Sequence, residues 1–229
     1  MTNTVTKGYF VTGTDTGVGK TLVACALLRA YAGRGLRAVG MKPVAAGAAP
    51  GAQGLRNEDV ECLVAAGNVV APREHVNPYC FGPAIAPHIA AAQAGVRIES
   101  ARIEQACRAL AALADVVIVE GAGGFRVPLG PGLDTAQVAA RLALPVVLVV
   151  GLRLGCLNHA LLTAEAIASH GLELAGWVAN HLDPGMIAAD ENVRALEGLI
   201  AAPLIARIAH TPSPDPAALD GILDRLKLS

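Results

Sequence analysis

One stretch near the start of the chain, Gly13 to Thr21, constrains the fold more than any other. It follows the apolar run Tyr9–Val11 and precedes the helix-compatible run Leu22–Leu28. A strand, a glycine-rich turn and a Gly-Lys-Thr that opens a helix form the context of a phosphate-binding loop. In such a loop, backbone N–H groups and the positive end of the helix dipole surround a phosphate. We expect Lys20 to reach the β- and γ-phosphates of a nucleotide and the Thr21 hydroxyl to bind Mg²⁺.

The spacing inside this stretch departs from the usual phosphate-loop pattern. In G-x-x-x-x-G-K-T the first glycine would stand at position 14, which is Thr14, while Gly13 lies one residue earlier. The alternative to a phosphate site is a glycine-rich turn that carries a solvated lysine. The strand before the turn and the helix after it favour the phosphate site.

Composition and periodicity predict an α/β fold of one domain, residues 1–229, built as a three-layer α/β/α sandwich. The chain is 53% hydrophobic but only 3% aromatic, so its core must consist of Ala, Val, Leu and Ile. Short apolar runs alternate with amphipathic segments of helix length, which indicates βαβ units and a mainly parallel central sheet. We expect strands at 8–13, 37–42, 115–120, 145–150, 174–180 and 204–208. We expect helices at 19–33, 57–66, 86–94, 100–113, 135–142, 157–170, 187–200 and 216–227.

Two segments fit this alternation less well. Residues 43–56 are rich in Gly, Ala and Pro, and residues 68–87 contain four prolines. Loops of this length in a compact domain are more often functional than idle.

Charge and cysteine usage exclude several classes of function. The chain has 18 Lys and Arg against 19 Asp and Glu, so bulk charge gives no indication of a nucleic acid or membrane partner. The five cysteines are widely spaced and form no C-x-x-C pair, which predicts small buried thiols of a reducing compartment. No signal peptide, membrane segment, dinucleotide fingerprint, G-x-S-x-G motif or histidine metal-ligand spacing is visible. We therefore predict a cytoplasmic protein.

Three charged side chains are expected near the phosphate loop, because parallel strands present their carboxyl ends at one edge of a sheet. Glu120 ends the third predicted strand and is either a Mg²⁺ ligand or a plain strand-ending carboxylate. Lys42 ends the second strand at an exposed edge, as a second cation for phosphate charge or as a solvated lysine. Asp59 stands in the first turn of a helix, as a site residue or as a partner of the helix dipole.

An ordered set of short motifs covers nearly the whole chain, from about residue 9 to residue 210. The motifs are Tyr9–Thr21, Lys42–Val44, Gly54–Asp59, Val76–Tyr79, Pro87–Ile89, Val119–Gly124, Leu154–His159 and Ala175–Asn180. Any one of them is weak, but the ordered set is specific. With it, the chain resembles the dethiobiotin synthetases, the ATP-dependent carboxylases of biotin biosynthesis, and the displaced first glycine is that family's form of the loop.

This resemblance implies a P-loop NTPase fold and a defined reaction. One amine of 7,8-diaminononanoate (7,8-diaminopelargonate) would react with CO₂, supplied as CO₂ or bicarbonate, to give a carbamate. ATP, with Mg²⁺, would phosphorylate the carbamate to a carbamic-phosphoric anhydride. The second amine would then close the ureido ring of dethiobiotin and release ADP and phosphate. The resemblance also implies a homodimer with the substrate at the subunit interface.

The resemblance implies catalytic, metal-binding, nucleotide-binding and substrate-binding roles for individual residues. Lys20 and Lys42 are the implied catalytic residues, which stabilise charge on the transferring phosphoryl group and the carbamate. The implied Mg²⁺ ligands are Thr21, Asp59 and Glu120. The implied nucleotide contacts are Thr16, Gly17, Val18, Gly19, Lys20, Thr21, Asp59, Glu120, Gly121, Ala122, Gly123, Asn180 as the adenine reader, His181, Ala209, His210 and Thr211. The implied substrate contacts are Thr16, Lys42, Ala46 and, from the second subunit, the helix start Gly155, Cys156, Leu157 and Asn158.

The sequence departs from the family pattern at three places, and two other functions compete with the synthetase. Gly17 stands where some members have Glu, Ala46 where a Ser often contacts substrate, and Ala209–Thr211 where Pro-x-Leu is more typical.

A partner-switching ATPase of the chromosome-partitioning or septum-site type would share the layered fold, but such proteins carry a second lysine where this chain has Asp15. A synthetase that amidates corrin-ring carboxylates usually carries a glutaminase domain as well, for which 229 residues leave no room.

Overall fold

The central feature of the computed structural model is a six-stranded sheet in which all strands run parallel. The structure describes residues 7–52, 54–211, 215–219 and 221–226. The strands in spatial order are β2 (Ala38–Met41), β7 (Val116–Glu120), β1 (Gly8–Gly13), β10 (Val146–Leu152), β11 (Leu174–His181) and β12 (Leu204–Ile208). Each lies within two residues of its expected position. The predicted parallel sheet is confirmed.

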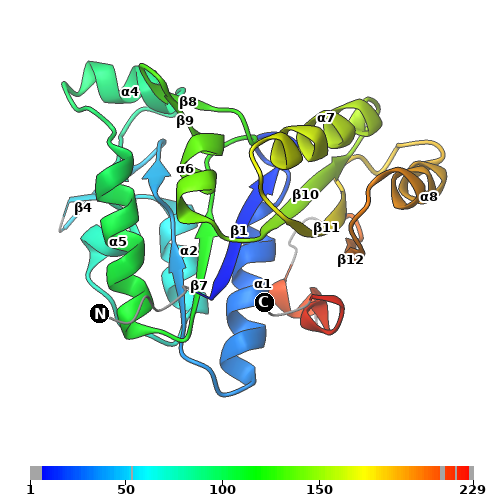
Figure 1. The fold of residues 1–229 in the computed structure, drawn as a ribbon, viewed down its shortest axis with the longest axis horizontal. Helices are drawn as coiled ribbons and strands as arrows, with labels where there is room; N and C mark the ends of the chain where they lie inside the picture. Colours follow the sequence, from blue (N-terminus) through cyan, green and yellow to red (C-terminus); the bar gives the residue numbers. More distant parts are fainter. Residues whose placement is uncertain (1–6, 53, 212–214, 220, 227–229) are drawn as a thin grey trace.

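Helices cover both faces of the sheet, which confirms the three layers (Figure 1). One face packs against α5 (Ser100–Leu113), α6 (Thr135–Leu142), α7 (Cys156–Ser169) and α8 (Ala189–Leu199). α4 (Pro87–Gln93) adds Ala90 and Ala91 to the same apolar core but lies against the segment 128–130, beyond the edge of the sheet. The other face packs against α1 (Lys20–Gly33), α2 (Glu58–Ala66) and two short 3₁₀ helices, η1 (Pro216–Leu219) and η2 (Ile222–Arg225). Ala, Val, Leu and Ile make up most of the two apolar cores, as the composition predicts. All seven aromatic residues are buried in these cores as well, and Trp177, Tyr9 and Tyr31 are among the largest fully buried side chains.

The strand order places the phosphate loop at the point where the chain changes direction across the sheet. After β1 the chain moves to one side for β2 and β7, and after that it moves to the other side for β10, β11 and β12. Ligands of open parallel sheets bind at such a switch point, outside the carboxyl ends of the strands. The loop from Gly13 to Lys20 lies at that place, directly after β1.

Short elements occupy the two segments that had seemed irregular. In residues 43–56, β3 (Val44–Ala45) is followed by a hairpin of β4 (Ala49–Gly51) and β5 (Gly54–Arg56). In residues 68–87, α3 (Arg73–Val76) leads into β6 (Tyr79–Cys80), which pairs with β3. A further hairpin, β8 (Pro128–Gly130) and β9 (Leu133–Asp134), follows the glycines after β7.

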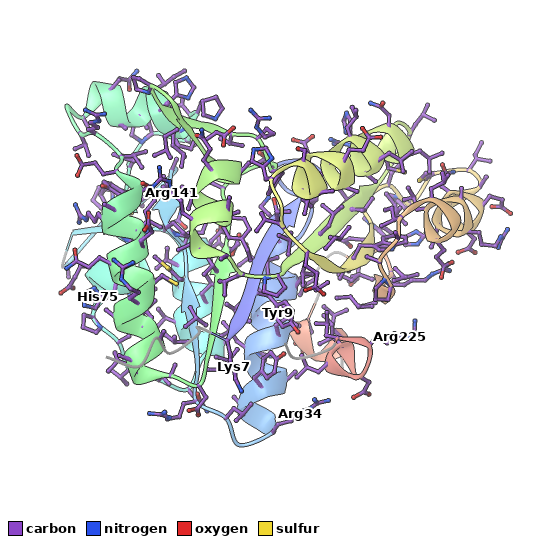
Figure 2. The ribbon with its side chains drawn as sticks, viewed as in Figure 1. Lys7, Tyr9, Arg34, His75, Arg141 and Arg225 are labelled. Atoms are coloured by element: carbon purple, nitrogen blue, oxygen red, sulfur yellow. The ribbon has the colours of Figure 1, made fainter. Side chains whose placement is uncertain are left out.

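The predicted helix at 216–227 is wrong over the described part of that range. Two 3₁₀ helices stand there instead, separated by Gly221 at a φ of +83°. This left-handed backbone ends a helical turn and redirects the chain. η2 contacts the end of α1 through an ion pair, in which Arg34 Nη2 lies 2.8 Å from Asp224 Oδ1. Figure 2 shows Arg34 at the C-terminal end of α1 and Arg225 at the end of η2.

The structure bears on membrane-spanning helices and on the state of the cysteines. Within the described residues, no helix has the length and apolar character that would let it cross a membrane. All five cysteines lie in the described part of the chain and none forms a disulfide. Cys25, Cys107 and Cys156 are buried as predicted, but Cys80 is only half-buried, and Cys62, which lines a cavity between α1 and α2, is exposed.

Candidate active site

The glycine-rich loop has the backbone that a phosphate cradle requires. Gly17 and Gly19 adopt φ values of +74° and +92°, which side chains rarely tolerate. A Cβ on Gly19 would lie 2.5 Å from Nδ2 of Asn180, so this glycine is also required by the close approach of β11. α1 begins at Lys20 directly after the loop, and its first N–H groups and dipole point toward the space the loop encloses.

Thr14, which stands in place of the first glycine, has a structural function of its own. Its backbone N–H donates to the Val149 carbonyl at 3.0 Å, and its hydroxyl accepts a hydrogen bond from the Gly151 N–H at 3.3 Å. These two contacts tie the loop to the end of β10. The unusual spacing therefore replaces a flexible glycine by a side chain that anchors the loop to the neighbouring strand.

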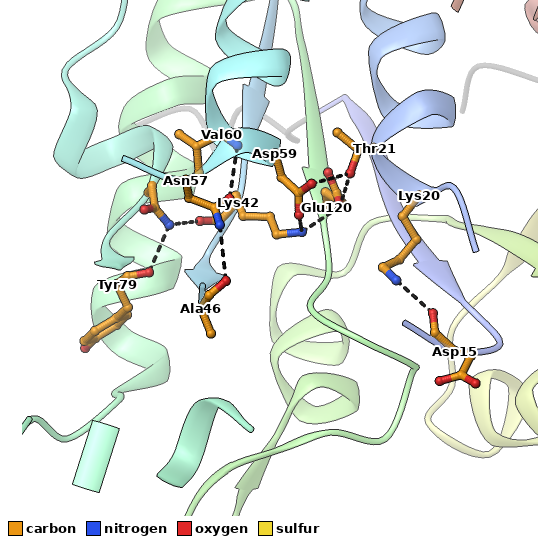
Figure 3. A network of polar contacts seen from close by, with 11 residues as sticks. Asp15, Lys20, Thr21, Lys42, Ala46, Asn57, Asp59, Val60, Tyr79 and Glu120 are labelled. Carbon is orange, nitrogen blue, oxygen red and sulfur yellow. Dashed lines mark hydrogen bonds and ion pairs between the residues drawn. The ribbon is translucent and has the colours of Figure 1, made fainter. Parts of the chain in front are cut away.

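Lys20 is buried and folded back onto its own loop. Its Nζ donates to the carbonyl oxygen of Asp15 at 2.9 Å, and the residue is only 6% exposed (Figure 3). Burial lowers the pKa of Lys20 to about 8, with the positive charge of Lys42 adding to the effect and Glu120 and Asp59 opposing it. A phosphate in the loop would bring negative charge to this ammonium group.

Lys42, Asp59 and Glu120 meet in one cluster, as the sequence predicted. Lys42 Nζ lies 2.7 Å from Asp59 Oδ2 and 2.6 Å from Glu120 Oε1 (Figure 3). The expectation that Lys42 sits at an exposed edge is wrong: its side chain is 5% exposed, because the start of α2 folds over the end of β2 and brings Asp59 against the lysine. The Glu120 side chain is 1% exposed.

The charges in this cluster are unequal. Burial would lower the pKa of Lys42, but the two carboxylates outweigh burial and raise it, so the lysine stays protonated at neutral pH. Burial raises the pKa of Glu120, and the charge of Asp59 adds to the rise against the opposing effect of Lys42. The pKa of Asp59 is lowered, because Lys42 and Thr21 outweigh its partial burial. One ammonium group therefore faces two carboxylates, which leaves negative charge for a cation to neutralise.

Thr21 joins the carboxylates to the phosphate loop. Its Oγ1 lies 2.9 Å from Asp59 Oδ1 and 2.9 Å from Glu120 Oε1. A hydroxyl has one proton, so it can donate to only one of these two acceptors at a time. Glu120 Oε2 is buried and, among the residues that the structure describes, has no hydrogen-bond partner. The site thus holds the Thr21 hydroxyl oxygen, one oxygen of Asp59 and both oxygens of Glu120. Oxygen atoms of this kind are the ligands that a hard divalent cation prefers.

The oxygens of Thr21, Asp59 and Glu120 are too few to fill the coordination shell of a metal ion by themselves. Across the described ranges, no group of three or more His, Cys, Asp or Glu side chains is placed to hold a metal ion. A cavity of about 390 Å³ opens between α1 and α2 beside Thr21 and Asp59, so water and ions reach these side chains. Mg²⁺ typically keeps several waters and shares substrate phosphates, so a hydroxyl and two carboxylates suit it.

Asn57 positions both Asp59 and the segment that contains Ala46. Its side-chain oxygen caps α2 by accepting from the Val60 N–H at 3.4 Å, and its Nδ2 donates to the Ala46 carbonyl at 3.2 Å (Figure 3). The residue is buried, at 6% exposure. No role was predicted for Asn57 from the sequence, although its motif, Gly54–Asp59, belongs to the ordered set. The N-cap pattern of an Asn before a helix was the signal that could have identified Asn57.

The remaining sequence-predicted residues lie on other sides of the loop, and Asn180 contacts it directly. Asn180, at the end of β11, donates from Nδ2 to the Val18 carbonyl at 2.9 Å, and His181 follows it, half-buried. Residues 209–211 are exposed beyond the end of β12. A Cβ on Gly123 would lie 3.5 Å from Thr16 Oγ1, so the turn after β7 faces the loop, with Gly121 and Ala122 leading into it.

The start of α7 is joined to the phosphate loop through an ion pair. Arg153 pairs with Asp15, and α7 begins two residues after Leu154, with Gly155 as its N-cap at a φ of +94°. Cys156 is buried, Leu157 half-buried and Asn158 exposed. Neither Asp15 nor Arg153 was given a site role from the sequence. The ion pair links residues 138 positions apart, so no local pattern indicates it.

This chain is similar in sequence to a family model and to two proteins that share more than half of its residues. A family model described as an AAA domain matches residues 7–218. The chain is 56% identical over 211 residues to the ATP-dependent dethiobiotin synthetase BioD of Aromatoleum aromaticum, which covers 92% of this chain and 94% of the relative. It is 54% identical over 218 residues to the protein of the same name in Nitrosospira multiformis, with 95% of both chains covered.

Solved structures with the same fold are more distant in sequence. MinD of Aquifex aeolicus aligns with a TM-score of 0.58 at 15% identity, covering 96% of this chain and 94% of that chain. A ParA family ATPase from Chlorobium tepidum aligns with a TM-score of 0.55 at 15% identity, covering 96% of this chain and 91% of that chain. At this level of identity the likeness shows a common fold.

Proposed function

The chain belongs to the family of ATP-dependent dethiobiotin synthetases, and on that basis we propose how its own residues carry out the reaction. It is a ligase of biotin biosynthesis that depends on ATP. The observation that carries the proposal is the position of Lys42, whose ammonium group lies within 2.7 Å of both Asp59 and Glu120, next to the phosphate loop.

The proposed reaction joins CO₂ to one amine of 7,8-diaminononanoate. The nitrogen lone pair forms a bond to the carbon of CO₂, and loss of a proton leaves a carbamate. A carbamate oxygen then attacks the γ-phosphorus of ATP, the bond to ADP breaks, and a carbamic-phosphoric anhydride results. The second amine attacks the carbamate carbon, phosphate leaves, and the ureido ring closes. Two amines, one CO₂ and one ATP thus yield dethiobiotin, ADP, phosphate and protons.

Two lysines would stabilise the negative charge that this sequence of steps generates. Lys20 is held 2.9 Å from the Asp15 carbonyl inside the loop and would contact the β- and γ-phosphates. Lys42 stays protonated and lies on the β2 side of the cluster, where it would bind the carbamate and the transferring phosphoryl oxygens. Fixed cations in a buried site stabilise such charge far better than water does, because their orientation costs nothing during the reaction.

Thr21, Asp59 and Glu120 are the residues that would hold Mg²⁺. Their oxygens lie around a common point, and the buried Glu120 Oε2 has no partner among the described residues. The bound ion would supply positive charge to the phosphate oxygens of ATP. The chain itself contributes the burial of Glu120 and the N-capped helix that keeps Asp59 at this point.

The two ends of the substrates would be bound by different surfaces. Asn180, with His181 and residues 209–211 beside it, would read the adenine base. Thr16 and the turn Gly121–Gly123 would lie along the phosphates, and Ala46 would contact the diamine. In a homodimer, the first turn of the second subunit's α7, Gly155–Asn158, would receive the carboxylate of the diamine, because a helix N-terminus favours an anion. We place the reaction in the cytoplasm, since all five cysteines are free thiols.

The competing function as a partner-switching ATPase is less well supported. MinD and ParA proteins share the fold but only 14–16% of residues with this chain. The position where those ATPases carry a second lysine is Asp15, which is engaged in an ion pair with Arg153.

The test is to measure ATP hydrolysis with and without each co-substrate. We expect ADP release to require both 7,8-diaminononanoate and bicarbonate, and a ureido product to be detected by mass spectrometry. Labelled bicarbonate should place its carbon in the ureido carbonyl. Hydrolysis that is indifferent to the diamine, but stimulated by a partner protein or a lipid surface, would contradict the proposal and favour the ATPase alternative.

A further inference from the structure

Lys42 lies one residue beyond the end of β2, so its backbone is outside the ladder of the central sheet. β2 ends at Met41. The Lys42 N–H donates instead to the Val76 carbonyl at 2.8 Å, and its own carbonyl accepts a hydrogen bond from Asn77 Nδ2 at 2.6 Å. Both polar groups of the Lys42 backbone are therefore held by two consecutive residues, Val76 at the end of α3 and Asn77 directly after it.

Asn77 uses both of its amide hydrogens on backbone carbonyls. Besides the Lys42 carbonyl, its Nδ2 donates to the Tyr79 carbonyl at 3.0 Å, and the residue is 7% exposed. Tyr79 in turn donates from its N–H to the Pro43 carbonyl at 3.2 Å, in the parallel pairing of β6 with β3. The amide thus lies at the junction where the chain leaves β2 and enters β3. A neutral side chain with two N–H donors is required here, because both partners are acceptors.

Pro43 makes this junction more rigid. A proline fixes its own φ and restricts the residue before it to extended conformations, so Lys42 has few backbone alternatives. With its carbonyl held by Asn77, the direction in which its Cα–Cβ bond leaves the backbone is determined. The Nζ at the end of that side chain then lies between Asp59 and Glu120.

We propose that Asn77 is a positioning residue for Lys42: its amide holds the Lys42 carbonyl and so places the ammonium group for phosphoryl transfer. This inference rests on the proposed function of Lys42. Asn77 does not contact the carboxylates or the loop in the described structure, so its effect on the reaction passes through the backbone of Lys42. The Val76–Tyr79 motif, which no role in the site had explained, supplies this support.

The chain offers a matched control at the other end of the same strand. Asn68 also makes two hydrogen bonds to the backbone around β2, accepting from the Ala38 N–H at 2.8 Å and donating to the Leu36 carbonyl at 2.9 Å. Its two partners lie at the amino end of β2, at the opposite end of the strand from Lys42. Asn68→Ala and Asn77→Ala each remove two hydrogen bonds to backbone groups, but only Asn77→Ala removes one from the Lys42 carbonyl.

The experiment compares steady-state kinetics of the two full-length variants at a temperature where circular dichroism shows both to be folded. We expect Asn77→Ala to lower kcat by about 10- to 100-fold, because a displacement of about 1 Å at a reacting group has effects of that size. The KM for ATP should change less than about threefold, since the phosphate loop is untouched. Asn68→Ala should keep kcat within about twofold of the unchanged enzyme. Asn77→Ser, which retains one donor, should restore part of kcat and serves as the test variant if Asn77→Ala does not fold.

Each outcome decides the question. A kcat for Asn77→Ala equal to that of Asn68→Ala would overturn the proposal, as would a loss confined to the KM for ATP. If Asn77→Ala does not fold, a kcat for Asn77→Ser equal to that of Asn68→Ala would overturn it instead. If Lys42→Ala, measured alongside, kept its turnover, the proposed function of Lys42 would fail and the inference with it. If Lys42→Ala lost turnover while the Asn77 variants did not, only the inference about Asn77 would fail.

Discussion

The neighbouring strands β2 and β7 have an ion pair at each end, and the two pairs behave differently. At the amino ends, Arg37 Nη2 lies 2.7 Å from Asp115 Oδ1, with side chains that are 60% and 39% exposed. At the carboxyl ends, Lys42 Nζ lies 2.6 Å from Glu120 Oε1, with side chains that are 5% and 1% exposed. Asp115 and Glu120 stand only five positions apart, yet the pKa of Asp115 is lowered and that of Glu120 is raised.

Solvation explains the difference between the two ends. Water solvates the exposed pair whether or not it forms, so its charges contribute little to stability. The buried pair has lost that solvation, and each charge is tolerated because its partners are in place. The exposed end has one cation for one carboxylate, whereas the buried end has one cation in contact with two. The buried end is therefore the one prepared to receive further charge from ligands.

Removing the cation from the buried end should have the largest effect. We expect Lys42→Ala to lower kcat by about 10³-fold, because a preorganised stabilising group is lost. It should also lower the free energy of unfolding by about 3 kcal/mol or more, because two carboxylates lose the cation that compensates them. Initial-rate assays of product formation measure kcat, and urea unfolding measures the free energy of unfolding. An unchanged urea midpoint would show that the carboxylates are solvated in solution, which would contradict the burial described here.

Removing a charge from the metal-binding oxygens should have the next largest effect. Glu120→Gln keeps the shape of the side chain but replaces a carboxylate oxygen by an amide. We expect the Mg²⁺ concentration for half-maximal activity to rise by about 10-fold or more, because an anionic ligand is lost. Asp115→Asn, at the other end of β7, is the control and should leave the Mg²⁺ titration unchanged. Equal Mg²⁺ dependence in both variants would remove Glu120 from the proposed metal site.

A pH profile tests the electrostatics of the loop beside the buried end. Because burial lowers the pKa of Lys20 to about 8, the free enzyme loses the Lys20 charge as the pH rises through that value. The unprotonated amine attracts phosphate less, so log(kcat/KM) for ATP should decline above about pH 8, while kcat at saturating ATP declines at higher pH. Bound phosphate would favour the charged form and delay its loss. A kcat/KM profile that stays level to pH 10 would contradict the lowered pKa.

Breaking the exposed pair should have the smallest effect. In Asp115→Asn the Arg37 side chain returns to water, so we expect kcat within about twofold and little change in the urea midpoint. The pKa of Asp115 is lowered from 3.8 by its hydrogen bonds to Arg37. Any stability from this pair is therefore present above pH 3.8 and is lost as the pH falls through the lower folded-state pKa. Urea unfolding at neutral pH and below pH 3 checks this, and a large neutral-pH difference would contradict it.

The sequence predicted those parts of the molecule that depend on repeated or local patterns. Apolar runs alternating with helical segments predicted all six strands of the main sheet. Parallel topology then placed Lys42 and Glu120 at the same edge as the loop, and the structure joins them at 2.6 Å. The P-loop signature predicted the start of α1 to within a residue.

The parts that the sequence missed depend on contacts between distant segments. Strands of two or three residues, such as β3 and β6, are too short to show an alternating pattern. Lys42 was expected to be exposed because the pattern of β2 does not reveal that α2 covers its end. Asn77 acts on a carbonyl 35 positions away, and a buried amide among prolines has no sequence signal of its own.

The hydrogen bond from Lys20 to the Asp15 carbonyl has a consequence for how a nucleotide enters. The ammonium group already has an acceptor in the loop, so an arriving phosphate exchanges one partner for another and gains only the difference between them. In return, the loop is ordered before binding and little conformational entropy is lost when the nucleotide arrives. Such a loop favours ligands that bring strong negative charge and discriminates against neutral groups of the same shape, because only a charged oxygen improves on the carbonyl it replaces.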